Sequence, residues 1–145
     1  MSDTRMSVAE REAFLAGLHV GVVSIPAAGV GDPPLSAPVW YDFEPGGHYW
    51  FLTGRTSRKG RLLQVGTRLT LVAQQEALPY AYVSVEGSVV AMRDCAQEED
   101  TRPMARRYLG AEQGDAYTAA TAAESDSVRV EVRPERWLTV DYAKQ

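Results

Sequence analysis

The sequence is poor in the residues that most often build disulfides and metal sites: 145 residues contain one cysteine and two histidines. A single cysteine, Cys95, cannot form an internal disulfide, and His19 and His48 have no further ligand at a usable spacing, so no metal site is predicted. The apolar runs are short and interrupted, so neither a membrane span nor a secretory leader is expected. These absences favour a single cytoplasmic domain over residues 1–145.

Charge is distributed unevenly along the chain. The sequence has 19 Asp and Glu against 15 Lys and Arg, with a net charge of −4 and a pI near 5.2. This balance argues against a nucleic-acid binder, including a nucleic-acid-binding barrel, because such binding depends on neutralising phosphates. Residues 53–75 nevertheless contain no Asp or Glu, although Arg55, Arg58, Lys59 and Arg61 lie there. The expected partner of this segment is a small anion.

Strands dominate the predicted secondary structure. Ser7 and Glu10 have the spacing of a capping box, which predicts a helix over residues 8–17 that ends at Gly17. Pro134 predicts an edge position or a bulge in the last strand. The close spacing of strands predicts an antiparallel barrel or sandwich rather than a doubly wound sheet. Alternating apolar residues and turn signals predict six strands, at 19–25, 35–43, 48–53, 67–74, 80–92 and 127–142.

Two further helical segments are predicted between the strands. Ser57 or Thr56 is expected to cap a short helix that turns Leu62, Leu63 and Val65 inward. Residues 94–123 are rich in Ala, Glu and Arg and are expected to be helical, with breaks at Pro103, Gly110 and Gly114.

The short helix places cations where they are unfavourable. Arg58 and Lys59 occupy its first turn, which the helix dipole makes unsuitable for positive charge until an anion binds. Two charge-assisted hydrogen bonds contribute about 1.5–3 kcal/mol each, whereas a micromolar ligand requires about 8 kcal/mol. A phosphate would therefore be an anchor, and the rest of the ligand is expected to be flat and apolar. The alternative is a solvated basic helix balanced by acids from elsewhere in the fold.

The segment "FLTGRTSRKGRLLQ", followed by "VGTRLTLV", resembles the pyridoxamine 5′-phosphate oxidase family and its flavin- or deazaflavin-binding split β-barrel relatives. In that family a strand ending in Thr is followed by a loop and by Ser-Arg-Lys at the start of a helix. The resemblance implies a mainly β fold, an antiparallel six-stranded split β-barrel with short peripheral helices. It also implies that the cofactor's phosphate is held by Thr53, Ser57, Arg58 and Lys59, and that its ring is flanked by Val39, Trp40 and Tyr41.

The function implied by the resemblance is an oxidoreductase that transfers hydride at the face of a bound ring. FMN is the preferred cofactor, a deazaflavin coenzyme of the F420 type is the alternative, and haem is less favoured. The cofactor would lie at the interface of a homodimer that acts on a small-molecule substrate. Strand 35–43 lacks the basic residue of the vitamin oxidase, and residues 127–142 lack its histidine, so pyridoxine 5′-phosphate is not the expected substrate. No catalytic residue is identified, and a non-catalytic carrier of flavin, haem or another small ligand remains a second hypothesis.

Two features have a structural and a functional interpretation. Arg106 and Arg107 in "ARRYLG" either complement a helix C-terminus capped by Gly110 or contact a substrate or partner subunit. Cys95 is interpreted as a spare thiol, because no histidine lies near it in the sequence.

Overall fold

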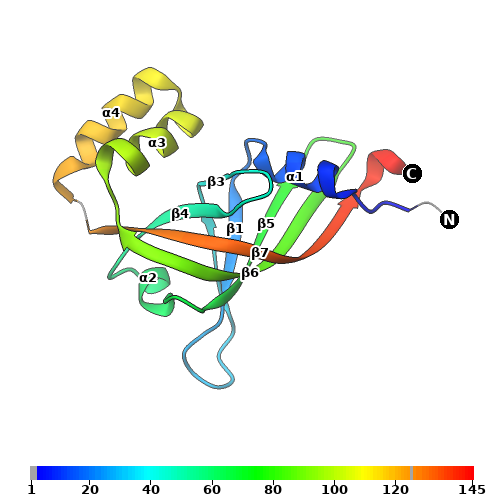
Figure 1. The fold of residues 1–145 in the computed structure, drawn as a ribbon, viewed down its shortest axis with the longest axis horizontal. Coiled ribbons are helices and arrows are strands. Elements are labelled where there is room, and N and C mark those ends of the chain that lie inside the picture. The colour runs from blue at the N-terminus through cyan, green and yellow to red at the C-terminus, as the bar shows by residue number, and fades with distance from the viewer. Residues whose placement is uncertain (1–2, 125) are drawn as a thin grey trace.

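The structure is a computed structural model that describes residues 3–124 and 126–145 (Figure 1). The strands are β1 (Gly21–Ile25), β2 (Leu35–Val39), β3 (Tyr41–Phe43), β4 (Tyr49–Gly54), β5 (Arg68–Gln75), β6 (Ala81–Asp94) and β7 (Ser127–Asp141). The helices are α1 (Val8–Ala16), α2 (Arg58–Leu62), η1 (Gln97–Thr101), α3 (Arg102–Leu109), α4 (Ala111–Thr121), η2 (Ala122–Glu124) and η3 (Tyr142–Lys144). Within the described ranges, no helix has the length and hydrophobicity that crossing a membrane requires.

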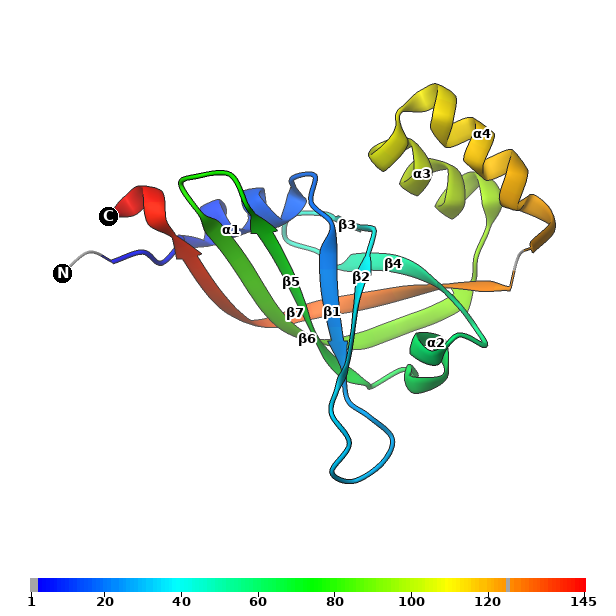
Figure 2. The same ribbon diagram turned by 180° about the vertical axis from the view of Figure 1, so that it is seen from behind.

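The strands form one antiparallel sheet whose two edges meet. Its order is β2-β1-β5-β6-β7-β4-β3, so β2 and β3 are opposite edges, although only Trp40 separates them in the chain. Because consecutive Cα atoms are about 3.8 Å apart, the two edges come together at Trp40, and the sheet curls around its core (Figure 2). The mainly β split barrel is thereby confirmed. It has seven strands rather than the expected six, because segment 35–43 divides at Trp40.

A side chain from a distant helix explains the division at Trp40. The hydroxyl of Tyr108 in α3 accepts a hydrogen bond from the backbone N–H of Tyr41 at 3.1 Å and lies 2.6 Å from the carbonyl oxygen of His19. The Trp40 ring stacks on the Tyr108 ring, with centroids 4.9 Å apart and planes 6° from parallel. The local sequence predicts one continuous strand because the group that interrupts it lies 67 residues further along the chain.

Several local predictions are confirmed. The capping box is present: the Ser7 hydroxyl accepts from the N–H of Glu10 at 3.1 Å, and the Glu10 carboxylate accepts from the N–H of Ser7 at 2.8 Å. β7 lies between β6 and β4, so Pro134 is not on an edge. It marks a bulge, since Gly87 pairs with Pro134 and Glu86 with Arg136, leaving one extra residue on β7.

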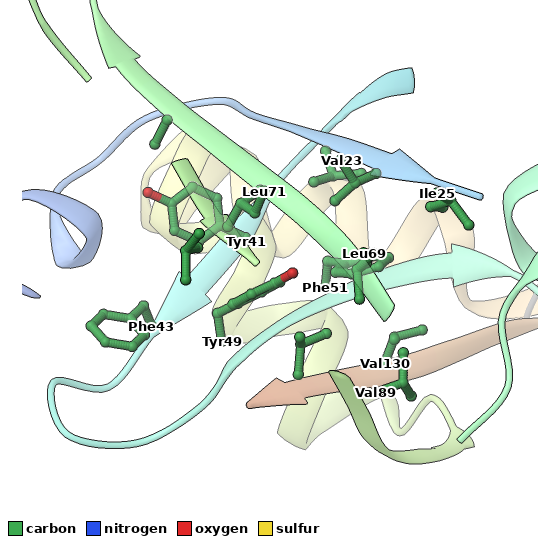
Figure 3. Packing of buried hydrophobic residues seen from close by; sticks show 14 of the residues in the cluster. Val23, Ile25, Tyr41, Phe43, Tyr49, Phe51, Leu69, Leu71, Val89 and Val130 are labelled. Atoms are coloured by element: carbon green, nitrogen blue, oxygen red, sulfur yellow. The ribbon is translucent and has the colours of Figure 1, made fainter. Parts of the chain in front are cut away.

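The barrel interior holds a contiguous apolar core (Figure 3). Tyr41, Tyr49, Phe51, Leu71 and Val130 are each fully buried in it, on alternate positions of their strands. Helix α1 packs against this core through Leu15, whose carbonyl oxygen accepts a 2.7 Å hydrogen bond from the Tyr41 hydroxyl. Among the described residues, this core cluster includes none from η1, α3 or α4.

η1, α3 and α4 form a helical hairpin beside one end of the barrel (Figures 1 and 2). Gly110 separates α3 from α4 with a φ of 85°, as expected for a helix-ending glycine. The break predicted at Gly114 is wrong. Gly114 lies buried inside α4, where a Cβ would be 2.7 Å from the Cα of Arg106, so its role is close packing of the two helices. The break predicted at Pro103 is also absent, because proline is tolerated in the first turn of α3.

Candidate functional site

The loop between β4 and α2 is shaped by hydroxyl groups. Ser57 caps α2: its Oγ accepts from the N–H of Gly60 at 3.0 Å and donates to the carbonyl oxygen of Gly54 at 2.7 Å. Thr53 Oγ1 lies 3.2 Å from Ser57 Oγ, and the Thr56 hydroxyl donates to Asp126 at 2.9 Å. Ser57 is therefore the cap. Both Thr53 and Ser57 are engaged in holding the loop's conformation.

Helix α2 packs unusually closely on this loop through Gly60. Gly60 is buried, and a Cβ there would overlap the carbonyl oxygen of Gly54 and lie 2.7 Å from that of Arg55. Leu63 is buried as expected, but Val65 is 62% exposed. The inward orientation predicted for Val65 is wrong because α2 ends at Leu62, before the helical spacing reaches it.

A cavity of about 670 Å³ lies between this loop, the barrel and the helical hairpin. Its barrel wall includes Pro38 and Leu52, its α2 end includes Lys59, and its hairpin wall includes Met104 and Tyr117. The volume falls within the range of about 300–1,000 Å³ that is typical of small-molecule and cofactor sites.

The structure brings most of the predicted site residues together around this cavity. Arg58 is exposed and is not part of the lining. Tyr41 is fully buried in the barrel core, so its side chain does not face the cavity. The predicted residues that line it are Val39, Trp40, Thr53, Ser57 and Lys59.

The four cations of the basic segment have different environments. Arg55 forms an ion pair with Asp94. For this residue, therefore, the alternative interpretation holds: its positive charge is neutralised by an acidic residue from another part of the fold. Among the described residues, neither Arg58 nor Arg61 has an ion-pair partner, and both are exposed. Lys59 is half-buried and also lacks an ion-pair partner in the described chain. Of the lining residues that the structure describes, Lys59 alone carries a charge.

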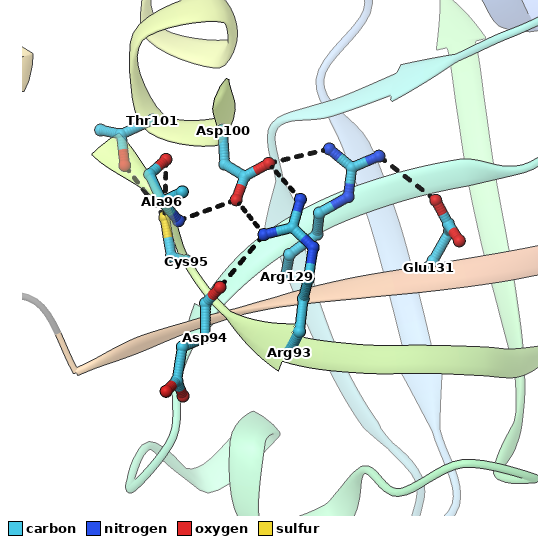
Figure 4. A network of polar contacts seen from close by, with 8 residues as sticks. All are labelled: Arg93, Asp94, Cys95, Ala96, Asp100, Thr101, Arg129 and Glu131. Carbon is cyan, nitrogen blue, oxygen red and sulfur yellow. Dashed lines mark hydrogen bonds and ion pairs between the residues drawn. The ribbon is translucent and has the colours of Figure 1, made fainter. Parts of the chain in front are cut away.

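A buried carboxylate fixes the start of the helical hairpin (Figure 4). Asp100 is fully buried and accepts hydrogen bonds from Arg93 at 2.6 and 2.9 Å, from Arg129 at 3.0 Å and from the N–H of Ala96 at 2.8 Å. Burial raises the pKa of Asp100, but the hydrogen bonds from Arg93, Ala96 and Arg129 together outweigh it, so the pKa is lowered. The network joins η1 to β6 and β7, which positions the hairpin wall of the cavity.

Two arginines hold the rest of the hairpin. Arg107 donates to the carbonyl oxygens of Tyr41 at 3.0 Å and Gly17 at 2.8 Å, which ties α3 to β3 and to the end of α1. Arg106 donates to Asp115 of α4 at 2.7 and 2.8 Å. Neither arginine lines the cavity. Their contacts hold α3 to its neighbours rather than complement its own C-terminus.

The histidines lie outside the cavity lining, whereas the cysteine is part of it. The ring of His19 stacks on Phe14, and its Nε2 is 3.0 Å from the Phe14 carbonyl oxygen. His48 lies 3.6 Å from Glu131 near the surface. Cys95 is a lining residue of the cavity, and its Sγ lies 3.0 Å from Thr101 Oγ1. In residues 3–124 and 126–145, no three His, Cys, Asp or Glu side chains are grouped so that they could hold a metal ion.

The hairpin wall is the part of the cavity that the sequence did not indicate. Residues 94–123 contain none of the motif residues on which the resemblance rests, and contacts with distant segments bring them to the cavity, among them the Asp100 network and the hydrogen bonds of Arg107 and Tyr108. One local signal was available. Gly114, Tyr117, Thr118 and Thr121 follow the i, i+3, i+4, i+7 spacing of one face of α4, so Tyr117 and Thr121 lie beside the buried Gly114 and Thr118 and were candidates for a surface that faces another part of the fold.

The sequence comparison identifies the family. Residues 8–141 match the protein family described as pyridoxamine 5′-phosphate oxidase. The chain belongs to the pyridoxamine 5′-phosphate oxidase family. No curated protein matches the sequence of this chain significantly.

Several solved structures have the same fold as this chain. A conserved hypothetical protein, Rv2991 from Mycobacterium tuberculosis, has a TM-score of 0.77 at 21% identity, with 99% of this chain and 90% of that chain covered. An F420 reductase has a TM-score of 0.69 at 17% identity, covering 88% and 94%. An FAD- and haem-binding protein from Mycobacterium smegmatis has a TM-score of 0.63 at 11% identity, covering 95% and 72%. These likenesses establish the fold of this pyridoxamine 5′-phosphate oxidase family member.

Proposed function

We propose that this protein is a flavin- or deazaflavin-dependent oxidoreductase that binds its cofactor in the cavity between α2 and the helical hairpin. The observation that carries the proposal is Lys59, a half-buried residue of the cavity lining that has no counter-ion in the described chain. A cation in that position is stabilised when a phosphate binds to it. Family membership and the F420, FAD and haem proteins of the same fold support a cofactor of this class.

The residues present fit such a cofactor. The cavity lining combines apolar and aromatic groups, among them Pro38, Val39 and Trp40, with hydroxyl and amide groups and with one cation at the α2 end. Lys59 would bind the phosphate, and Val39 and Trp40 would contact the ring and exclude water from it. The bound flavin would supply the redox chemistry. FMN remains the preferred cofactor over the deazaflavin; neither histidine lines the cavity, which makes haem the less favoured ligand.

We expect Lys59→Ala to weaken FMN binding by more than tenfold. Loss of one charge-assisted hydrogen bond removes about 1.5–3 kcal/mol, and about 1.4 kcal/mol corresponds to tenfold. Fluorescence titration of FMN into the purified protein measures the change. The melting temperature of the cofactor-free protein should stay the same or rise slightly, because a cation is removed from a cluster of cations.

Arg61→Ala is the matched control, since Arg61 is an exposed cation of the same helix and does not line the cavity. It should leave FMN affinity within about threefold of the unmodified protein. Equal affinities of the Lys59→Ala and Arg61→Ala proteins would contradict the anchor assignment. Parallel titrations with a deazaflavin and with haem rank the three cofactors.

Catalysis distinguishes the proposed enzyme from a carrier on the same fold. A carrier binds and releases the cofactor unchanged, whereas an oxidoreductase exchanges electrons between the reduced cofactor and an acceptor. Oxidation of the bound reduced cofactor by added acceptors, at rates above those of free cofactor, is the expected result.

We further propose that the protein is a cytoplasmic homodimer; its single cysteine is consistent with a reducing compartment. Support for the dimer comes from the outer face of the sheet. Val22, Val72, Ser84 and Leu138 are paired in register across β1, β5, β6 and β7, and Val22 and Leu138 are 39% and 59% exposed. Three of these four side chains are apolar, and such a row on the outer face is suited to burial against a second subunit.

Leu138→Glu should therefore convert the dimer to a monomer. A carboxylate in the centre of an apolar interface loses its hydration without gaining a partner. Light scattering after size-exclusion chromatography should show twice the 15.9 kDa chain mass for the unmodified protein and the single mass for the variant. Val30→Glu, at a fully exposed position of the β1–β2 loop, is the control and should remain dimeric. A monomeric unmodified protein at micromolar concentration would contradict the dimer.

A further inference from the structure

The two ends of the cavity differ in charge. Lys59 of α2 lies at one end, and the helical hairpin forms the other; α2 and the hairpin are on opposite sides of β4 in both views of the ribbon (Figures 1 and 2). The side chains that the hairpin wall contributes are uncharged, and they include Gln97, Thr101, Met104 and Tyr117. A ligand that spans the cavity therefore meets a cation at one end and a neutral surface at the other.

The arginines of α3 do not alter this neutral surface, because each is already bound. Arg102 is paired with Glu98 at 3.0 Å and with Asp115 at 2.6 Å. Arg106 shares Asp115, and Arg107 is held by backbone carbonyl oxygens and by Asp42 at 3.3 Å. None of the three lines the cavity. Recruiting any of them to an anion would require breaking the contacts that hold the hairpin in place.

The wall does offer neutral hydrogen-bonding groups and an aromatic surface. The Gln97 amide and the Tyr117 hydroxyl have no hydrogen-bond partner in the part of the chain that the structure describes. Tyr117 is 44% exposed, and the centroid of its ring lies 5.8 Å from that of the Trp40 ring, with the two planes tilted by 51°. Trp40 is itself fixed by stacking on Tyr108. A flat compound can pack on these rings while its oxygen atoms bond to the amide or the hydroxyl.

We propose that the hairpin wall is the substrate subsite, that it selects uncharged, planar, apolar compounds bearing a carbonyl or hydroxyl group, and that Tyr117 is a specificity-determining residue. The inference rests on the proposed function, since the substrate shares the cavity with a cofactor anchored at Lys59. An anionic substrate would lose water on entering and find no free cation on this wall. A neutral planar compound loses little hydration and gains contact with Tyr117 and Met104.

Two probes of the same ring system, one neutral and one anionic, test whether the hairpin wall prefers uncharged compounds. The dissociation constants of 1-naphthol and of 1-naphthalenesulfonate are measured by calorimetry with FMN-loaded protein, so that Lys59 is occupied. The same pair is measured with cofactor-free Lys59→Ala protein, in which the competing cation is absent. In both proteins, 1-naphthol should bind at least tenfold more tightly than the sulfonate.

Tyr117→Arg places a guanidinium on the wall and should shift the ratio of the two affinities toward the sulfonate by at least tenfold. Arginine has a high helix propensity and the position is exposed, so the variant is expected to fold. Ala119→Arg adds the same charge to an exposed position of α4 that does not line the cavity, and it should leave the ratio unchanged.

Equal binding of the two probes, or the same ratio in Tyr117→Arg and Ala119→Arg proteins, would overturn the inference, whatever the FMN titrations give. If FMN does not bind but the Lys59→Ala protein still prefers 1-naphthol, the selectivity of the wall is supported and the cofactor assignment fails. The two proposals are therefore tested separately.

Discussion

Gly60→Ala should lower the free energy of unfolding by about 3 kcal/mol and abolish measurable FMN binding. The added methyl group would overlap the carbonyl oxygen of Gly54 and lie 2.7 Å from that of Arg55, and both are backbone atoms that cannot rotate away. The loop or α2 must move, and either movement displaces Lys59 and breaks the cap made by Ser57. Thermal unfolding should show a fall in melting temperature on the order of 10 °C.

Gly54→Ala provides the control for stability. It makes the same chemical change at the end of β4, six residues before Gly60, but its new Cβ would have Ser57 Cβ as its nearest neighbour, at an ordinary 3.6 Å. Its free energy of unfolding should remain within about 0.5 kcal/mol of the unmodified protein. Comparable losses in the two variants would mean that glycine is required here for backbone freedom in general, and not for the close packing of α2.

Asp100→Asn should destabilise the protein by about 2–3 kcal/mol. The amide keeps the size of the carboxylate, but it leaves Arg93 and Arg129 without their shared negative charge in a buried position. This loss lies at or just below the lower limit of about 3–5 kcal/mol for broken buried pairs, because the Arg93 side chain is 48% exposed. Urea denaturation measures the global effect, and faster amide exchange in α3 would show that the helical hairpin is the part that loosens.

Glu98→Gln is the matched control for this carboxylate. Glu98 pairs with Arg102 at 3.0 Å, but its side chain is 74% exposed, so losing its charge should change stability by less than about 1 kcal/mol. Equal effects of the two substitutions would show that Asp100 contributes no more than a surface ion pair.

The predictions that succeeded depend on residues close together in the sequence. The capping box of α1, the cap of α2 at Ser57 and the bulge at Pro134 each involve groups within a few residues or an intrinsic property of proline. The family resemblance extended this local information to the fold and to the position of the basic loop.

The features that the sequence did not predict depend on contacts between distant segments. Tyr108 divides segment 35–43 into two strands, and the fold leaves Arg58 outside the cavity lining while Lys59 lines it. Adjacent residues of a helix face different directions, but which one faces the cavity depends on how α2 packs through Gly60. The hairpin wall likewise depends on contacts between segments far apart in the sequence, such as those of Asp100 in η1 with Arg93 of β6 and Arg129 of β7.

The single residue between β2 and β3 limits how the length of this chain can change. An inserted residue beside Trp40 would force β2 to slip against β1 or β3 to slip against β4, and a slip of one position exchanges inward and outward side chains. The loop at residues 26–34 has no such restriction, because it connects β1 and β2 through solvent. Homologous sequences should therefore vary in length at this loop and hold a constant spacing from Val39 to Tyr41.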